Sequence, residues 1–316
     1  MKFHFGLGKF FSIYDKEHNT ILRQVVENNF GIHYCLDYPG SGKFFRHNTS
    51  KNERDSIKAI TRVPCFDTTI LQNEVDLALK ELDVGQIDTL QLWGGEEVFD
   101  CYDENSELFS ILLLLKEQGK INSFLPQMYY NQAVELAKLN NDKLKSFAFY
   151  GSPVDMHISE KLIKSDTISN SIAMSIFGGV DKNVMPALIT QEEKDYYEYL
   201  KQNYSWTEIS LSHLNSFNFI NRVVGTTGDL KHFSEIVNYF NDNKAEMINT
   251  HPELLHKISI QSCTKEYMSV NDSKQRWESN YSRLRSDKTY YKSLIYFYIK
   301  KSQWIHKSVD FIFGRK

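Results

Sequence analysis

The sequence predicts an α/β protein built as a (β/α)₈ (TIM) barrel with a helical extension at the C-terminus. Strand-like and helix-like segments alternate along the chain, which implies parallel strands joined by helical crossovers. Seven strands can be counted, and the missing one is expected between Gly179 and Trp206. Eight strands would close a barrel, and the barrel would be irregular or incomplete if one strand were absent. Seven or fewer strands would suit an open doubly wound sheet. Both folds bind ligands at the C-terminal ends of their strands.

Each element is expected from its local pattern. Short β-branched or apolar runs that end in glycine or polar residues predict strands at 3–7, 33–36, 59–63, 87–93, 147–150, 168–177 and 219–224. Apolar residues at helical spacing predict helices at 21–28, 51–57, 70–82, 107–118, 126–140, 158–163, 191–202 and 207–217. Thr20 is the expected N-cap of the first helix, and Thr68 or Thr69 that of the helix at 70–82. Segment 38–42 is expected to be a loop.

The segment 219–240 shows the clearest strand–turn–helix pattern. A β-branched strand runs into Gly-Thr-Thr-Gly, and Asp229 then offers an N-cap carboxylate to a helix. The apolar stripe of that helix comprises Leu230, Phe233, Ile236, Val237 and Phe240. A turn with hydroxyl groups before a helix N-terminus can bind a phosphate or another anion, although an ordinary strand-to-helix turn has the same pattern. The segment is expected to be the last strand–helix unit of the barrel.

Composition limits the class of protein. The 316 residues are 41% hydrophobic and 24% charged, an ordinary globular balance. The longest apolar run, 111–115, is too short to span a bilayer, and the N-terminus lacks the apolar region of a signal peptide. The four cysteines are scattered without CxxC spacing, and the histidines show no ligand spacing, so we expect neither a metal site nor a disulfide framework. A cytoplasmic location is the simplest expectation.

Charge is distributed unevenly. Segment 274–316 carries eleven Lys or Arg and three Asp or Glu, a local net charge of +8, whereas the whole chain has −3. We therefore expect two regions, a barrel at 1–245 and a helical, basic and aromatic extension at 246–316. Segment 290–313 mixes aromatic and basic residues, which suits a peripheral contact with an anionic membrane surface or a protein partner. Packing on the barrel is the alternative, and nucleic acid is less favoured because no recognition motif accompanies the charge.

Several segments, in order, resemble the aldo-keto reductases. The family motifs GLG, AGxxxxD, I-T-K-V, SLKRLGxxYIDLY, LKxxGKI and IxGTTxxxHL resemble segments at 6–8, 28–37, 60–63, 77–90, 115–121 and 224–233. Together the matches span roughly residues 3 to 240. The resemblance implies a (β/α)₈ barrel that binds NADPH or NADH across its mouth and transfers hydride to a carbonyl, with an Asp, Tyr, Lys and His tetrad.

The resemblance carries the catalytic residues over only in part. Asp37 matches the catalytic Asp, although it lies one residue beyond the family's spacing. Gly42 stands at the position of the catalytic Tyr, so Tyr38 would have to supply the phenol. Arg62 stands at the Lys position, and its pKa is too high to share a proton with a phenol near neutral pH. Trp93 stands at the His position, and an indole offers one donor and no acceptor. Asp37 and Arg62 could equally form a structural ion pair, and Trp93 could plug the mouth.

The same resemblance implies a cofactor site. Ser152 loosely matches the strand that clamps the nicotinamide, and the phosphate-binding turn is best preserved, with Gly225, Thr226, Thr227 and His232. NADP is the implied cofactor, although a chain that differs at three tetrad positions could also have lost cofactor binding.

Three functions therefore stay open. The first is a divergent barrel that lacks ordinary carbonyl reduction and binds a phosphorylated or nucleotide-linked small molecule, for example as an accessory protein in surface-polysaccharide assembly. The second is an active NAD(P)H-dependent oxidoreductase acting on a carbonyl or sugar. The third is a non-catalytic interaction protein that docks through its basic tail.

Overall fold

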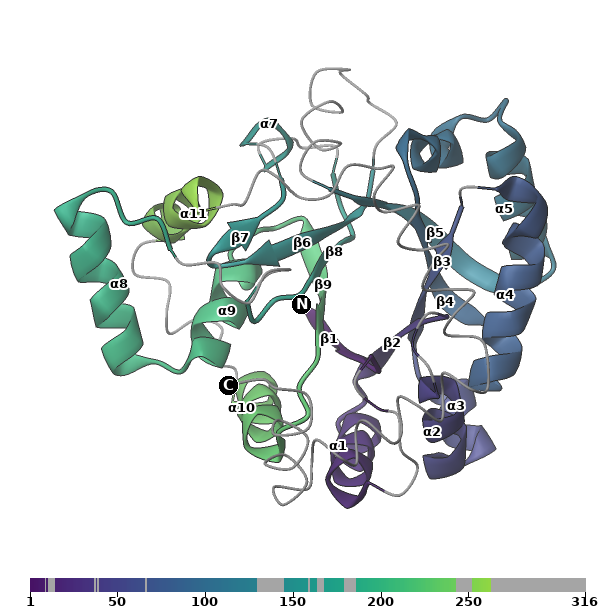
Figure 1. The fold of residues 1–316 in the computed structure, drawn as a ribbon, viewed down its shortest axis with the longest axis horizontal. Coiled ribbons are helices and arrows are strands. Elements are labelled where there is room, and N and C mark those ends of the chain that lie inside the picture. Colours follow the sequence, from purple (N-terminus) through teal and green to yellow (C-terminus); the bar gives the residue numbers. More distant parts are fainter. Residues whose placement is uncertain are drawn as a thin grey trace, which may run out of the picture.

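The computed structural model describes residues 1–8, 10, 15–36, 38, 40–65, 67–129, 145–158, 160–163, 168–178, 186–242 and 252–262. Eight parallel strands form a closed ring in the order β5-β4-β3-β2-β1-β9-β8-β6, with β5 and β6 paired to complete it. Figure 1 shows this ring at the centre of the molecule, with α1–α5 on one side and α8–α11 on the other. The predicted barrel is confirmed, and the open sheet is excluded.

The barrel strands follow the chain in order around the ring. They are β1 (Lys2–Gly6), β2 (Gly31–Cys35), β3 (Ala59–Pro64), β4 (Ile87–Trp93), β5 (Ile121–Met128), β6 (Ala148–Ser152), β8 (Ser171–Met174) and β9 (Ile220–Gly225). A two-residue strand, β7 (Asp155–Met156), pairs antiparallel with the end of β6.

Helices follow most of the strands. They are α1 (Lys16–Glu27), α2 (Ser41–Asn48), α3 (Lys51–Ser56), α4 (Thr68–Leu82), α5 (Glu107–Glu117), α7 (Glu160–Ile163), α8 (Gln191–Asn203), α9 (Trp206–Asn215), α10 (Leu230–Asn241) and α11 (Pro252–Gln261), with a 3₁₀ helix, η1 (Glu96–Tyr102).

The position expected for the missing strand was wrong. The strand is β5 and lies directly after α5, so the segment counted fifth in the sequence is the sixth strand of the ring. Residues 126–128, expected to start a helix, are the end of β5, and 130–144 lie outside the described residues. β5 was missed because its inward-facing side chains include Ser123 and Gln127, which hydrogen-bond to other strands instead of forming an apolar stripe.

Several local details also differ from expectation. The N-cap of α1 is Asp15 and not Thr20, and that of α4 is Asp67 and not Thr68 or Thr69. Each aspartate accepts hydrogen bonds from backbone N–H groups in the first turn, so it satisfies donors that the helix itself leaves unpaired. The expected loop after β2 gives way at Ser41 to the helix α2.

The core outside the ring is rich in aromatic residues. Phe3 and Phe5 point outward from β1, and their ring centroids lie 5.3 Å from those of Phe30 and Phe233 respectively. Both contacts are edge-to-face, a favourable geometry for aromatic pairs. Phe240 also packs against Phe3, with 5.9 Å between the ring centroids. The predicted stripe of α10 therefore faces β1, which confirms the amphipathic pattern.

The described part of the extension begins with α11. Leu255 and Ile258 of α11 pack with Tyr196 and Leu200 of α8 and with Ile209 of α9. The C-terminal helical extension is thus present as far as residue 262, and segment 290–313 lies outside the described residues. Within the described ranges, no helix has both the length and the apolarity needed to cross a membrane.

His4 faces the inside of the barrel and is 2% exposed. Burial lowers the pKa of its imidazole to about 3, and the nearby charges of Arg222 and His33 act in the same direction. The unfolded chain therefore binds a proton that the folded barrel excludes between pH 6.5 and about 3.

His4 should make the barrel sensitive to acid. Because the folded pKa is depressed, stability should fall with pH in this window, by ~2 kcal/mol between pH 7 and pH 5. Urea unfolding at several pH values would measure this loss. His4→Gln should flatten the pH dependence, whereas His47→Gln, at an exposed histidine, should not. An unchanged slope in His4→Gln would contradict the assignment.

Gly6 allows β1 and the turn after β9 to come into close contact. A Cβ atom at Gly6 would lie 2.1 Å from Oγ1 of Thr226, so the threonine would have to rotate or move. We expect Gly6→Ala to cost about 1–3 kcal/mol in urea unfolding, the range for an overpacked site. Thr226→Ala removes the clashing hydroxyl and should rescue most of this loss in the double variant. Additive losses would show that the two sites do not contact each other.

Candidate functional site

Inward-facing residues of the barrel form a partly aromatic cluster that extends to the C-terminal ends of the strands, here called the mouth cluster. Its members are Cys35, Ile60, Trp93, Leu125, Tyr129, Ala148, Tyr150, Ile172, Met174 and Val224, and Tyr38 packs against it. Ligands of (β/α)₈ barrels bind at this face. Of the predicted catalytic residues, Trp93 belongs to this cluster, and Tyr38 and Arg62 contact it.

Arg62 and Trp93 are engaged with each other and with the cluster. The Nε of Arg62 donates to Sγ of Cys35 at 2.9 Å, and its guanidinium carbon lies 5.1 Å from the centroid of the Trp93 ring. The indole N–H of Trp93 donates to the hydroxyl of Tyr129. A guanidinium does not give up its proton near neutral pH, and this indole has used its single donor. These two positions therefore do not supply a titratable proton relay.

Tyr38 lies at the mouth. Its ring would be 3.1 Å from a Cβ atom placed on Gly8, and its centroid is 6.4 Å from that of His33 in an edge-to-face contact. The phenol thus occupies the space between the ends of β1 and β2. Asp37 lies outside the described residues, so its predicted role stays a prediction.

A buried hydrogen-bond chain crosses the barrel below the mouth. Nε2 of His33 lies 3.2 Å from Oε1 of Gln91, Gln91 donates to Gln127 at 2.6 Å, and Gln127 donates to the hydroxyl of Tyr150 at 3.1 Å. Neither glutamine has any exposed surface, so each amide must be hydrogen-bonded to be tolerated there. Sequence reasoning missed this chain because Gln127 lies on the unassigned strand β5.

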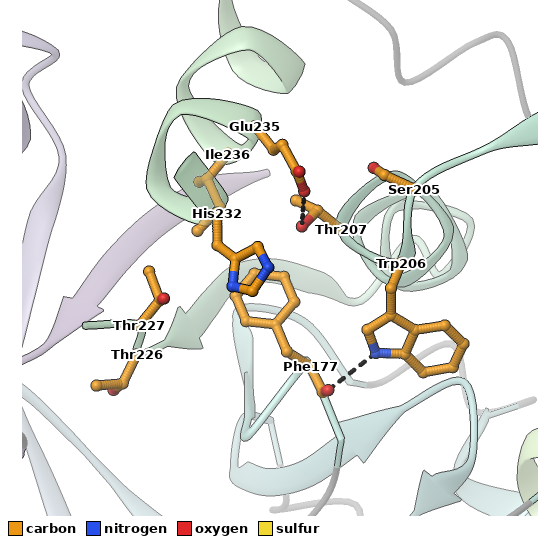
Figure 2. A pocket seen from close by; sticks show the side chains of 9 residues that line it. All are labelled: Phe177, Ser205, Trp206, Thr207, Thr226, Thr227, His232, Glu235 and Ile236. Carbon is orange, nitrogen blue, oxygen red and sulfur yellow. Dashed lines mark hydrogen bonds between the residues drawn. The ribbon is translucent and has the colours of Figure 1, made fainter. Parts of the chain in front are cut away.

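A cavity of about 400 Å³ opens beside the turn that follows β9. Thr226, Thr227 and His232 line it, so the structure brings together three of the five predicted cofactor-binding residues. Figure 2 shows the opposite wall, which is formed by Ser205, Trp206 and Thr207 at the start of α9 and by Phe177, which follows β8. The lining residues that sequence reasoning missed are Phe177, Ser205, Trp206, Thr207, Glu235 and Ile236. They come from three separate segments, and no local pattern joins them.

Two hydrogen bonds and one close approach hold the cavity walls in place. Trp206 Nε1 donates to the backbone carbonyl of Phe177 at 2.8 Å, and the Thr207 hydroxyl donates to Oε2 of Glu235 at 2.9 Å. Gly225, another predicted residue, ends β9 close to the Phe177 ring, and a Cβ atom there would lie 2.6 Å from that ring. Gly225 does not itself line the cavity, but a side chain at this position would push against Phe177, which does.

Carboxylate side chains already bind the backbone N–H groups in the first turn of α10. Oδ1 of Asp229 accepts the backbone N–H groups of Lys231 at 2.8 Å and His232 at 3.2 Å. These two bonds hold the pKa of the Asp229 carboxyl below its usual value, and the bond from the His232 N–H has the larger effect. The N–H of Leu230 makes a longer bond to Glu17, at 3.4 Å. The donors that a phosphate would use at this helix N-terminus are thus already bound to carboxylates.

Ser152 lies apart from the cavity lining. It is fully buried at the end of β6, and its hydroxyl accepts the backbone N–H of Val154 at 3.3 Å. Beyond it, Nε2 of His157 lies 2.8 Å from Oδ1 of Asp155, and neither side chain has exposed surface. Among the described residues, no group of three His, Cys, Asp or Glu side chains is placed to hold a metal ion.

Comparison with known proteins gives a structural likeness alone. No family model matches the sequence, and no curated protein matches it. An aldo-keto reductase from Bacillus halodurans, in its holo form, is 18% identical with a TM-score of 0.59, over 84% of this chain and 94% of that one.

Two structures from Pseudomonas aeruginosa agree with this likeness. Both are described as candidate aldo-keto reductases, with identities of 14% and 12% and TM-scores of 0.56 and 0.53. Each match covers 74% of this chain and 87% of the other. At this level of identity the likeness concerns the backbone, and it agrees with the closed parallel ring. This chain therefore has the fold of the aldo-keto reductases.

Proposed function

We propose that this barrel binds the nucleoside end of a nucleotide-linked small molecule, of the nicotinamide dinucleotide class, and does not perform ordinary carbonyl reduction. The observation that carries the proposal is the cavity beside Thr226, Thr227 and His232. The sequence resemblance predicts that these three residues bind the cofactor, and the cavity beside them supports the proposal.

The cavity fits a nucleoside. Its volume of about 400 Å³ lies within the range of small-molecule sites. Phe177 and Trp206 offer aromatic surface for a base, and Thr207 and Thr226 offer hydroxyl groups near it. A sugar hydroxyl could donate to Glu235. A nicotinamide dinucleotide, when bound, supplies hydride transfer, and the residues named here would hold its adenosine end.

The side chains at the barrel mouth do not favour the usual proton relay. In the relay that the resemblance implies, a lysine and a histidine tune a tyrosine that protonates the carbonyl oxygen. Arg62 and Trp93 stand at those two positions and contact Cys35 and Tyr129 instead. An accessory role, such as surface-polysaccharide assembly, and a membrane or protein contact through 290–313 are compatible with such a barrel and form part of the proposal.

One observation favours a second candidate, an active NAD(P)H-dependent oxidoreductase. Tyr38 packs against the mouth cluster, so a phenol is present at the face where a substrate would bind. In this alternative, Tyr38 donates the proton and Arg62 replaces the lysine as a fixed positive charge.

Trp206 allows binding to be measured directly. Because its indole lines the cavity, NAD⁺ or ADP-ribose should change the protein fluorescence, and calorimetry should give the same dissociation constant. His232→Trp, at an exposed position on the cavity wall, should weaken binding at least tenfold by filling the space. Asn238→Trp, on the exposed face of the same helix outside the cavity lining, is the matched control. The proposal fails if calorimetry detects no binding of NAD⁺, NADP⁺ or ADP-ribose.

Hydride transfer separates the two candidates. The proposed function predicts no oxidation of NADH or NADPH above background with simple aldehydes, in the wild type or in Tyr38→Phe. The second candidate predicts turnover that falls by a factor of about 10²–10⁴ in Tyr38→Phe, the usual contribution of a general acid. Cofactor oxidation followed at 340 nm measures both outcomes.

A further inference from the structure

The charge of the cavity bears on which nucleotide it accepts. Its nine lining residues include one carboxylate, Glu235, and one imidazole, His232, but no lysine or arginine. Lys231, the basic neighbour of His232, is exposed on α10 and is not among the lining residues. A phosphate group inside the cavity would therefore meet a negative charge without a fixed positive partner.

A hydrogen bond fixes the carboxylate of Glu235 on the cavity wall, where a ligand could contact it. The hydroxyl of Thr207 on α9 donates to its Oε2 at 2.9 Å, so a bond between two helices fixes the carboxylate on the cavity wall. Figure 2 shows this bond at the edge of the cavity, with the rings of His232 and Phe177 also drawn. A carboxylate fixed in this way can accept hydrogen bonds from ribose hydroxyls and repels a phosphate attached to the same sugar.

The neighbouring helix N-terminus adds to this repulsion. The carboxylate of Asp229 already accepts two N–H groups of the first turn of α10, and Glu17 accepts a third. An incoming 2′-phosphate would have to displace these anions, at a site where their charges also oppose it. Thr226 and Thr227 keep the sequence pattern of a phosphate-binding turn, but the donors behind them are not free.

We infer that the cavity selects the unphosphorylated adenosine ribose, so that NAD(H) binds in preference to NADP(H), and that Glu235 is the residue that sets this specificity. The inference rests on the proposed function, because it concerns the ligand of the same cavity. It departs from NADP, the cofactor that the sequence resemblance implies.

Calorimetry with NAD⁺ and NADP⁺ tests the inference. The wild type should bind NAD⁺ at least tenfold more tightly than NADP⁺. Glu235→Gln keeps the hydrogen bond to Thr207 possible but removes the charge, so NADP⁺ should bind several-fold more tightly and NAD⁺ should change little. Glu235→Lys should bring the preference to NADP⁺. Glu198→Gln removes an exposed carboxylate on α8 and should leave the ratio unchanged, and circular dichroism should show that each variant is folded.

The possible failures can be told apart. If NAD⁺ and NADP⁺ bind the wild type equally well, or NADP⁺ binds more tightly, the proposed function stands and the assigned specificity is overturned. The same holds if the ratio in Glu235→Gln equals that in the wild type. If neither dinucleotide binds, the proposed function and the specificity fall together.

Discussion

The pairing of β1 with β9 is the constraint on which the remaining architecture depends. The two strands lie parallel, with Lys2 opposite Arg222 and Phe5 opposite Gly225, and this pairing joins the first and last strands of the ring. A closed ring has no unpaired edges and brings all strand C-termini to one rim. It also places Gly6 against Thr226, so the last turn is seated on the first strand. The cavity wall formed by this turn exists because the ring closes.

The interior of the ring is unusually polar. Buried histidines and glutamines stand where barrels more often place branched apolar residues. The amides of Gln91 and Gln127 are tolerated because each finds a partner on a neighbouring strand, and a shift of register would leave them unpaired. The network therefore specifies the strand register and holds the hydroxyl of Tyr150 at the mouth.

The two helices beside the cavity both begin at capped N-termini. Asp229 caps α10 and Ser205 caps α9, and the two helices are joined across the cavity by Thr207 and Glu235. Capping by a carboxylate stabilises the helix and at the same time removes the donors that a phosphate would need. At the mouth, Arg62 donates a hydrogen bond to Cys35 and Trp93 donates one to Tyr129. The fold is that of the aldo-keto reductases, and its mouth carries an arginine and a tryptophan that contact each other.

Local pattern alone determined the unit β9–α10, because a β-branched strand, a glycine turn, an aspartate N-cap and an apolar stripe are all encoded within about twenty consecutive residues. The alternation of elements also indicated a barrel. Tertiary structure decided the position of β5, since the burial of Ser123 and Gln127 depends on partners in other strands. It also decided the cavity, because Phe177, Trp206 and Glu235 come together only through packing of separate segments, and such long-range contacts leave no periodic signal in the sequence.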